Sequence, residues 1–540
     1  MAGGGSCPPA ISDEWKNMVK YLFKRLLQGL VSVVIVVACV MVMIYSLMDR
    51  TLIFAKDTNY SHQSNNQKVA YRYEKWETYG YLDYVTYADY LNDLTVKGEI
   101  DEDTRSSAVS IGRKAKKDSD LVKEYVQKFT DFYESKGYTV IRLDAVMMNK
   151  KKYAAGGQQQ LFAYKNIPLT TRLAKYFSNL ITVESIHDVP EVEGERGLSF
   201  TLHDPVYGGE KFSPAIIGNG TQHKYLLYFD NKFPYLHQNI IEINLGKSYS
   251  VNEGIDVATT MSRAQGSFVK STITYPSGLT EDSADDLHTA TYLKDSREAS
   301  MVNETRFVDD YTNVDTVKGG KSKIGYSFTI GIIAVIISYL LAIPLGILMA
   351  RKKDKLIDQI GTLYIVFIIA VPSLAYIFLF KAIGGSMGLP TTFDMESSSK
   401  LMYILPIISL ALPQVANLMK WLRRYMIDQM NSDYVKFARS GGLTENEIFT
   451  KHILKNAAIP IVQGVPASVL GALIGAIITE RVYVVPGAGN LLTEAINQYD
   501  NGVIVGVTLF YALLSVLSVI LGDILMSMVD PRISFSTKDR

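Results

Sequence analysis

Residues 315–322 come closer than any other segment of this chain to a motif that could do chemistry. They read DTVKGGKS. A phosphate-binding loop of the form G-x-x-x-x-G-K-[ST] follows a hydrophobic strand and cradles phosphate oxygens with its backbone N–H groups. Here Asp315 stands where the first glycine is needed, and no hydrophobic strand leads into the segment. The segment therefore does not predict a nucleotide site.

The other residue types that support catalysis or metal binding are sparse. The seven histidines are scattered, and the only cysteines are Cys7 and Cys39. No Ser-His-Asp, Cys-His or metal-ligand spacing stands out. We expect no catalytic, cofactor-binding or metal-binding residues in this chain.

Charge is distributed very unevenly along the sequence. The 540 residues are 48% hydrophobic and carry a formal net charge of +1, which gives no reason to expect nucleic acid as a partner. Six stretches without a charged residue span 26–48, 324–350, 359–380, 401–419, 456–479 and 501–522. About 20 residues are needed to cross a hydrocarbon core of about 30 Å. The sequence therefore predicts six transmembrane helices.

The first stretch has an alternative interpretation as a cleaved signal peptide. It is too long for the apolar region of a signal peptide, and no small-residue cleavage site follows it. We interpret it as a retained membrane anchor.

The lysines and arginines of the short loops define an orientation, because such residues tend to stay in the cytoplasm. They are concentrated before the first stretch, after the second, between the fourth and fifth, and after the sixth. The short loops on the opposite side hold only Lys381, Lys400 and Arg481. Both termini are therefore expected inside. The predicted domains are a cytoplasmic tail (1–20), transmembrane helix 1 (21–48), an extracellular domain (49–323), a five-helix core (324–530) with a cytoplasmic loop at 423–457, and a second tail (531–540).

The predicted spans contain almost no ionisable residue, and Asp523 near the end of the sixth is the nearest exception. A charge at the bilayer centre costs at least about 2.5 kcal/mol and usually marks an ion or proton pathway. The sequence therefore argues against a proton-coupled transporter or a cation channel. Pro344 and Pro372 fall within the second and third spans, where they either kink the helix or only adjust its packing.

The cytoplasmic stretch 433–447 predicts two short helices with a break between them. Gly441 and Gly442 are expected to end the first helix, since glycine adopts a positive φ readily. Thr444 followed by Glu447 is a capping box that starts the second. We expect that second helix to end before Pro460, where the fifth span begins.

The order DYVKFARSGGL followed by KHILKNAAIP resembles the EAA loop of bacterial ABC importer permeases, in the form used by the oligopeptide and dipeptide group. Lys436, Phe437 and Ala438 replace the family's Glu-Ala-Ala, and Gly442 matches its glycine. The resemblance implies that this loop is a coupling helix that docks on an ATPase subunit, whereas an amphipathic helix resting on the membrane is the alternative. The implied coupling residues are Asp433, Tyr434, Lys436, Phe437, Ala438, Arg439, Gly441, Gly442, Leu443 and Glu447.

Further segments resemble the same family. Residues 468–489, with Glu480, Pro486, Gly487 and Gly489, are similar to its fifth span and outer loop, and 523–533 to its C-terminal signature. Residues 233–248 resemble the connection that precedes the family's second span. The similarity covers 325–535 strongly, 233–250 moderately and 21–48 weakly. The large insertion resembles the long permeases of Gram-positive, streptococcal-type oligopeptide systems.

The resemblance implies an all-α, six-helix permease fold, with the extracellular domain inserted between helices 1 and 2. It also implies a non-enzymatic subunit of an ATP-driven oligopeptide importer in the plasma membrane. The expected partners are a second homologous permease, two ABC ATPase subunits that bind ATP and Mg, a lipid-anchored peptide-binding protein, the peptide and membrane lipid. A peptide-sensing receptor is the alternative, while a channel or secondary transporter is disfavoured.

The segment 49–323 is expected to fold as an α+β domain. Residues at helical spacing precede Gly137, namely Val122, Tyr125, Val126, Phe129 and Tyr133. Thr139–Leu143 and Tyr225–Phe229 have the composition of strands. Tyrosine is dense at 71, 73, 79, 81, 84, 87 and 90. These tyrosines either form a wet recognition surface or pack a small domain against the membrane.

Overall fold

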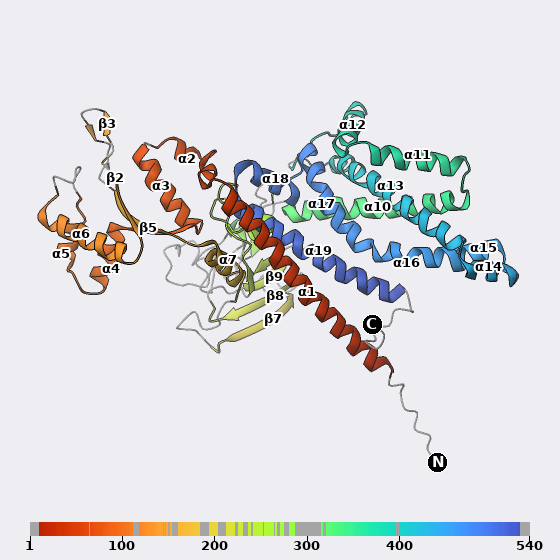
Figure 1. Cartoon of the computed structure of the whole chain (residues 1–540), viewed down its shortest axis with the longest axis horizontal. Helices are drawn as coiled ribbons and strands as arrows, with labels where there is room; N and C mark the ends of the chain where they lie inside the picture. The colour runs from red at the N-terminus through yellow and green to blue at the C-terminus, as the bar shows by residue number, and fades with distance from the viewer. Residues whose placement is uncertain are drawn as a thin grey trace, which may run out of the picture.

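The computed structural model describes most of residues 10–529 (Figure 1). It leaves out 64, 112–117, 144, 146, 150–151, 154–159, 184–193, 204–211, 222–224, 230–235, 239–240, 252, 264, 267–270, 275–279, 284, 287–314, 317–319, 396 and 398. Cys7 and the predicted C-terminal tail lie outside the described residues. Helix α1 already begins at Ala10, within the segment predicted as the N-terminal tail.

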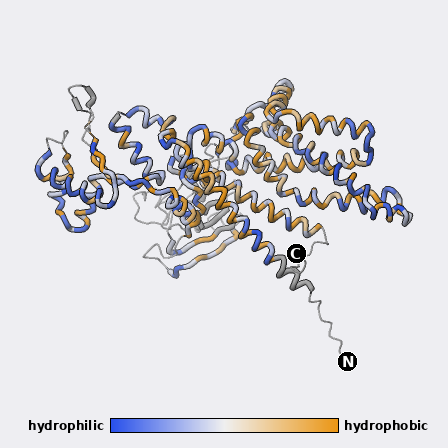
Figure 2. The backbone as a smooth tube through the Cα atoms, in the orientation of Figure 1, coloured by the Kyte–Doolittle hydropathy of each residue, from blue (hydrophilic) through white to orange (hydrophobic). Residues whose placement is uncertain are grey.

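Five of the described helices are long and apolar enough to cross a membrane. They run lengthwise through the helical half of the molecule, and hydrophobic residues dominate them (Figures 1 and 2). They are α1 (Ala10–Leu47), α10 (Lys323–Arg351), α13 (Ile404–Met430), α17 (Val465–Tyr483) and α19 (Asn501–Val529).

The third predicted span is not one straight helix. It consists of α11 (Leu356–Ala370) and α12 (Ser373–Ser386), which meet at a bend of 109°. Pro372 stands at the break, where it lacks a backbone N–H for the helical ladder. The predicted total of six spans is reached only when this pair counts as one crossing. Pro344, in contrast, lies inside the continuous helix α10.

The fifth predicted span is also divided, and the helix that leads into it does not stop where we expected. A helical run passes from α15 (Glu445–Glu447) through a π-helical segment (Ile448–Leu454) into α16 (Lys455–Gln463), with Pro460 inside it. The prediction of an end before Pro460 is therefore wrong. Ala457 and Ile461 are buried in a cluster with residues of α13, and this packing outweighs the helix-breaking tendency of proline. The break comes at Gly464, immediately before α17.

Small buried residues let the membrane helices pack closely. Ala334 of α10, Ala411 of α13 and Ala472 of α17 belong to one buried cluster. A second cluster joins α1 to α19 and to α18 (Ala488–Gln498). Because apolar burial gives little driving force between helices in lipid, close backbone approach of this kind is the usual stabilising arrangement.

The segment between α1 and α10 combines helices with antiparallel strands. Its first part has a three-stranded sheet of order β1-β5-β2, made of Leu82–Thr86, Gln160–Asn166 and Thr139–Leu143. The surrounding helices are η1 (Arg50–Phe54), α2 (Thr58–Ser61), α3 (Asn65–Thr78), α4 (Tyr87–Val96), α5 (Glu102–Ala108) and α6 (Asp120–Ser135), and β3 (Met147–Asn149) pairs with β4 (Lys152–Tyr153). The predicted helix around Phe129 and the strand at β2 are confirmed, and Gly137 has a φ of +79° after the helix.

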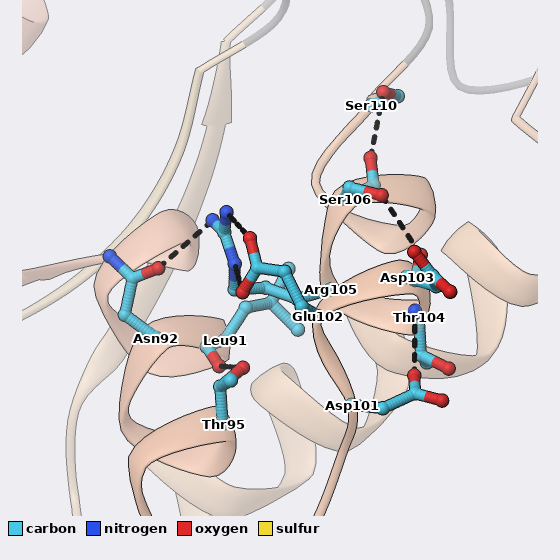
Figure 3. Close-up of polar contacts among 10 residues, drawn as sticks. All are labelled: Leu91, Asn92, Thr95, Asp101, Glu102, Asp103, Thr104, Arg105, Ser106 and Ser110. Carbon is cyan, nitrogen blue, oxygen red and sulfur yellow. Dashed lines mark hydrogen bonds and ion pairs between the residues drawn. The ribbon is translucent and has the colours of Figure 1, made fainter.

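Polar contacts hold α5 against α4 (Figure 3). Asp101 caps α5 by accepting a hydrogen bond from the backbone N–H of Thr104 at 2.8 Å. Arg105 pairs with Glu102 on its own helix and donates to Asn92 Oδ1 of α4 at 3.1 Å. These bonds orient two short helices that would be marginal on their own.

The second part of the segment is mainly strands. A four-stranded antiparallel sheet has the order β10-β9-β8-β7, and its strand β9 confirms the predicted strand at Tyr225–Phe229. The elements are α7 (Leu169–Ser178), β6 (Ile181–Val183), β7 (Gly197–His203), β8 (Phe212–Asn219), β9 (Tyr225–Phe229), β10 (Leu236–Gln238), β11 (Ile241–Ile243), α8 (Val257–Ser262), β12 (Ser271–Thr274), β13 (Thr280–Ser283), β14 (Asp285–Asp286) and β15 (Asp315–Thr316).

The dense tyrosines between positions 71 and 90 pack into the first part of the segment between α1 and α10. Tyr81, Tyr87 and Tyr90 are buried, and the other four are half-buried. Tyr87 packs edge-on against Phe129 with ring centroids 5.6 Å apart. The packing interpretation is therefore favoured over an exposed recognition surface.

Candidate functional site

The cytoplasmic loop predicted from the sequence folds as two helices with a tight turn between them. Helix α14 (Asp433–Ser440) ends at Gly441, and Gly442 follows with a φ of +82°. The N–H of Gly442 donates to the Arg439 carbonyl at 3.1 Å, and that of Leu443 to the Ala438 carbonyl at 3.3 Å. Only Gly442 needs the left-handed backbone region that glycine adopts without strain.

The second helix starts with the capping box that the sequence predicts. Thr444 Oγ1 accepts from the Glu447 N–H at 3.3 Å, and the Thr444 N–H donates to Glu447 Oε2 at 3.2 Å. Hydrogen bonds from the Thr444 side chain and backbone hold the pKa of Glu447 below its ordinary value. Across the turn, Arg439 forms a two-pronged ion pair with Glu445 whose shorter contact is 2.6 Å. The turn is thus bridged by side chains as well as by backbone.

The inner side of this loop is buried against α10 and α13. Val435 and Ile448 pack with Leu422 and Met426 of α13 in one cluster. Arg351, at the end of α10, donates to Asn446 Oδ1 and places its guanidinium 4.6 Å from the centre of the Phe449 ring. The loop is consequently fastened to two membrane helices.

The outer side of the loop exposes an apolar residue. Phe437 is 78% exposed and Leu443 is 38% exposed. Asp433 and Lys436 pair with each other at 2.8 Å in solvent. Tyr434 is half-buried and donates to Gln429 Oε1 at 2.7 Å. Sequence reasoning missed Val435, the buried residue that fixes α14 to the core, although its spacing of three from the half-buried Ala438 marks the inner face.

The four predicted outer-loop residues lie together, and three of them form a buried structural arrangement. Glu480 of α17 is fully buried, and its carboxylate accepts hydrogen bonds from Ser327 Oγ at 2.5 Å and the Asn490 N–H at 2.9 Å. A Cβ on Gly487 would collide with this carboxylate, and one on Gly489 would lie 2.6 Å from Ile477 Cγ1. Pro486 directly precedes Gly487 in the chain. Sequence reasoning did not identify Ser327, which joins α10 to this loop from 153 positions away.

A second buried carboxylate, Asp500, was also missed. It stands just before α19 and accepts hydrogen bonds from Ser248 Oγ and from three consecutive backbone N–H groups, those of Tyr249, Ser250 and Val251. Gly502 lies so close to the Lys247 carbonyl that no Cβ would fit. This contact attaches the segment before α10 firmly to the membrane helices. The only sequence indication was the family-like stretch 233–248.

The segment that resembles a phosphate loop begins a helix. Ser322 caps α10 by accepting from the Gly325 N–H at 3.0 Å, and Lys321 Nζ donates to Thr329 Oγ1 at 3.1 Å. Within the part of the chain that the structure describes, no group of three His, Cys, Asp or Glu side chains is arranged to hold a metal ion.

A groove of about 450 Å³ opens between α13 and the α16–α17 pair. Pro413 and Gln414 line it from α13, and Pro460, Gly464 and Ser468 line it from the opposite side. Tyr339 of α10 also lines it, and its hydroxyl is 3.0 Å from Ser468 Oγ. No substrate-contacting residue was predicted from the sequence.

Known proteins match both the helical core and the whole chain. Residues 342–535 match the family described as "binding-protein-dependent transport system inner membrane component". The oligopeptide transport system permease protein AmiC of Streptococcus pneumoniae is 32% identical over 531 residues, which cover 96% of this chain and 99% of that protein. The dipeptide transport system permease protein DppB of Lactococcus lactis is 30% identical over 41% of this chain and 73% of its own length.

A solved structure of the MetNI methionine ABC transporter aligns with 38% of this chain and 93% of its own chain, at 12% identity and a TM-score of 0.32. The assignment therefore rests on the sequence relatives and on the set of apolar helices. Together these define a multi-pass membrane permease of the ABC transporter class. The chain belongs to the oligopeptide and dipeptide group of that family, in its long streptococcal-type form.

Proposed function

We propose that this chain is the permease subunit of an ATP-driven oligopeptide importer. It forms half of the translocation pathway, and a second homologous permease forms the other half. Two ABC ATPase subunits bind ATP and Mg, so this chain itself is not an enzyme and holds no cofactor. A lipid-anchored binding protein delivers peptide to the extracellular domain at residues 49–323, and both termini face the cytoplasm of the plasma membrane.

The observation that carries this proposal is the construction of the loop at α14 and α15. Its inner side is buried on α13, while Phe437 is 78% exposed. Helices α14 and α15 lie at the end of the molecule far from the strand-rich segment (Figure 1). An exposed aromatic side chain on a helix that buried contacts hold in place is suited to insert into a pocket of another protein. Asp433, Lys436, Arg439 and Leu443 are also exposed on this loop, and we include them in the proposed docking surface.

Docking of this kind can transmit a large conformational change. Shifting a two-state equilibrium from 1:99 to 99:1 requires about 5.5 kcal/mol of differential binding. Closure of the ATPase subunits would supply this energy, and the loop would convert the pathway from inward-open to outward-open. The buried contacts of Val435 and Ile448 make the loop stiff enough for that task.

The test is the variant Phe437→Ala in a complex reconstituted into vesicles. Peptide uptake should fall about tenfold or more, since removal of a central aromatic from an interface commonly costs 2 kcal/mol or more. Met387→Ala is the matched control, because Met387 is 75% exposed but lies outside this loop. Normal uptake by Phe437→Ala would contradict the coupling role. A complete wild-type complex that binds peptide but never imports it would favour the receptor alternative.

A further inference from the structure

The groove between α13 and the α16–α17 pair has the dimensions of a ligand site. Its volume of about 450 Å³ lies within the range of about 300–1,000 Å³ that small-molecule pockets occupy. The helix opposite α13 is interrupted at Gly464, where α16 ends and α17 begins. Gly464 lines the groove, so the groove lies at the break that divides the fifth predicted span.

One face of α13 lines the groove along its length. Gln414, Asn417, Trp421 and Tyr425 all contribute, and their spacing of three or four residues places them on one side of the helix. From 413 to 425 the helix rises about 18 Å. An extended chain of about five residues has the same length.

Among the described residues, the lining carries no charged side chain, and it combines apolar residues with a few polar groups. Gln414 and Asn417 carry carboxamides, each with a donor and an acceptor, and none of the described residues that line the groove is ionisable as a carboxylate, ammonium or guanidinium. The hydroxyls of Tyr339 and Ser468 are already paired with each other at 3.0 Å. Besides the Trp421 indole N–H and the Tyr425 hydroxyl, the two carboxamides are the polar side-chain groups of this lining that can contact a ligand, and they alone offer both an amide N–H and a C=O.

Gln414 has an unused hydrogen-bonding atom. Its Oε1 is buried and has no hydrogen-bond partner among the described residues. A buried acceptor without a partner is unfavourable, and rotation of the glutamine side chain toward a bound amide would relieve this. Such an arrangement is expected where a ligand supplies the missing donor.

We propose that this groove binds the main chain of the peptide cargo. The Gln414 carboxamide exchanges hydrogen bonds with one main-chain amide, and the Asn417 carboxamide does so with the next amide along the peptide. This inference rests on the proposed import function. A carboxamide matches both the N–H and the C=O of a peptide unit, and an uncharged lining does not distinguish acidic from basic side chains. These hydrogen bonds are therefore made with the part of the peptide that is common to all sequences. A lipid acyl chain is the competing occupant, and it would leave both carboxamides without partners.

The first test measures pentaalanine uptake by the reconstituted complex as a function of peptide concentration. Gln414→Leu should raise the half-saturating concentration about three- to tenfold, which corresponds to the loss of one hydrogen bond. Gln414→Asn keeps a carboxamide and should restore most of the affinity. Gln359→Leu changes an exposed glutamine of α11 and should have no effect. An unchanged half-saturating concentration in Gln414→Leu would overturn the proposal.

The second test needs no variant, so it remains decisive if Gln414→Leu does not assemble. A pentapeptide with a diazirine side chain at its third residue is irradiated in the wild-type complex during turnover, and labelled residues are found by mass spectrometry. Labels are expected within 413–425 and 460–471. Labels confined to other helices would overturn the groove assignment, whereas a wild-type complex that imports no peptide would instead refute the proposed function.

Discussion

Ser248 donates a hydrogen bond to the carboxylate of Asp500 at 2.6 Å, across 252 positions of sequence. The same carboxylate receives the backbone N–H groups of Tyr249, Ser250 and Val251. Asp500 is fully buried, and a buried carboxylate is tolerated only when it is well supplied with donors. The turn at 248–251 and the start of α19 therefore form one unit, through which the strand-rich segment is attached to the membrane helices.

Asp500→Asn should lower the stability of the detergent-solubilised protein by about 2–4 kcal/mol. The variant removes the charge and turns an NH2 group toward backbone N–H donors, which leaves buried donors without acceptors. The apparent melting temperature measures the effect. Asp93→Asn, at an exposed position of α4, should change stability by less than about 0.5 kcal/mol. Equal melting temperatures for both variants would refute the structural role of Asp500.

Gly487→Ala should destabilise the protein by about 1–3 kcal/mol, because its Cβ would overlap the Glu480 carboxylate that Ser327 and Asn490 hold in place. Gly471→Ala is the control, since a Cβ there meets no atom within 4 Å and alanine favours a helix interior by about 1 kcal/mol. Thermal unfolding in detergent compares the two. A Gly487→Ala protein as stable as Gly471→Ala would show that the buried carboxylate moves freely.

Arg423→Gln should cost about 3–5 kcal/mol, because it removes the partner of the buried carboxylate of Asp358. Arg423 donates two hydrogen bonds to this carboxylate, at 2.5 and 2.7 Å, and so joins α13 to α11. The double variant Asp358→Asn with Arg423→Gln should recover part of the loss, since it leaves no buried charge. A double-mutant cycle on melting temperatures provides the measurement, and strictly additive effects would argue against the pair.

Gly442→Val should weaken the turn between α14 and α15 by about 1–2 kcal/mol or more, because valine disfavours the positive φ of this position. Under the proposed function, peptide taken up per ATP hydrolysed should fall. Gly441 has a φ of −75°, which alanine adopts readily, so the Gly441→Ala variant should retain coupling. Both ratios are measured in reconstituted vesicles. Normal coupling in Gly442→Val would show that the turn need not be rigid.

Local patterns were sufficient to predict much of the secondary structure. The capping box of Thr444 and Glu447, the glycine turn before it, and the strands at Thr139–Leu143 and Tyr225–Phe229 all form at the expected positions. Each depends on residues close in sequence, whose preferences act over one turn or one strand. The charge-free stretches likewise located the apolar helices by length alone. The resemblance to the peptide permease family also followed from short contiguous motifs.

The tertiary structure decided which of these elements are continuous and which residues meet. Proline breaks the helix at Pro372 but not at Pro344 or Pro460, because packing on neighbouring helices determines whether the lost hydrogen bond is tolerated. The partners of Glu480 and Asp500 are separated from them by 153 and 252 positions. No local pattern marks Ser327 or Ser248, since a serine becomes important only when folding brings a buried carboxylate beside it. Sequence therefore determined the apolar lengths and turns, and long-range burial selected the contacts.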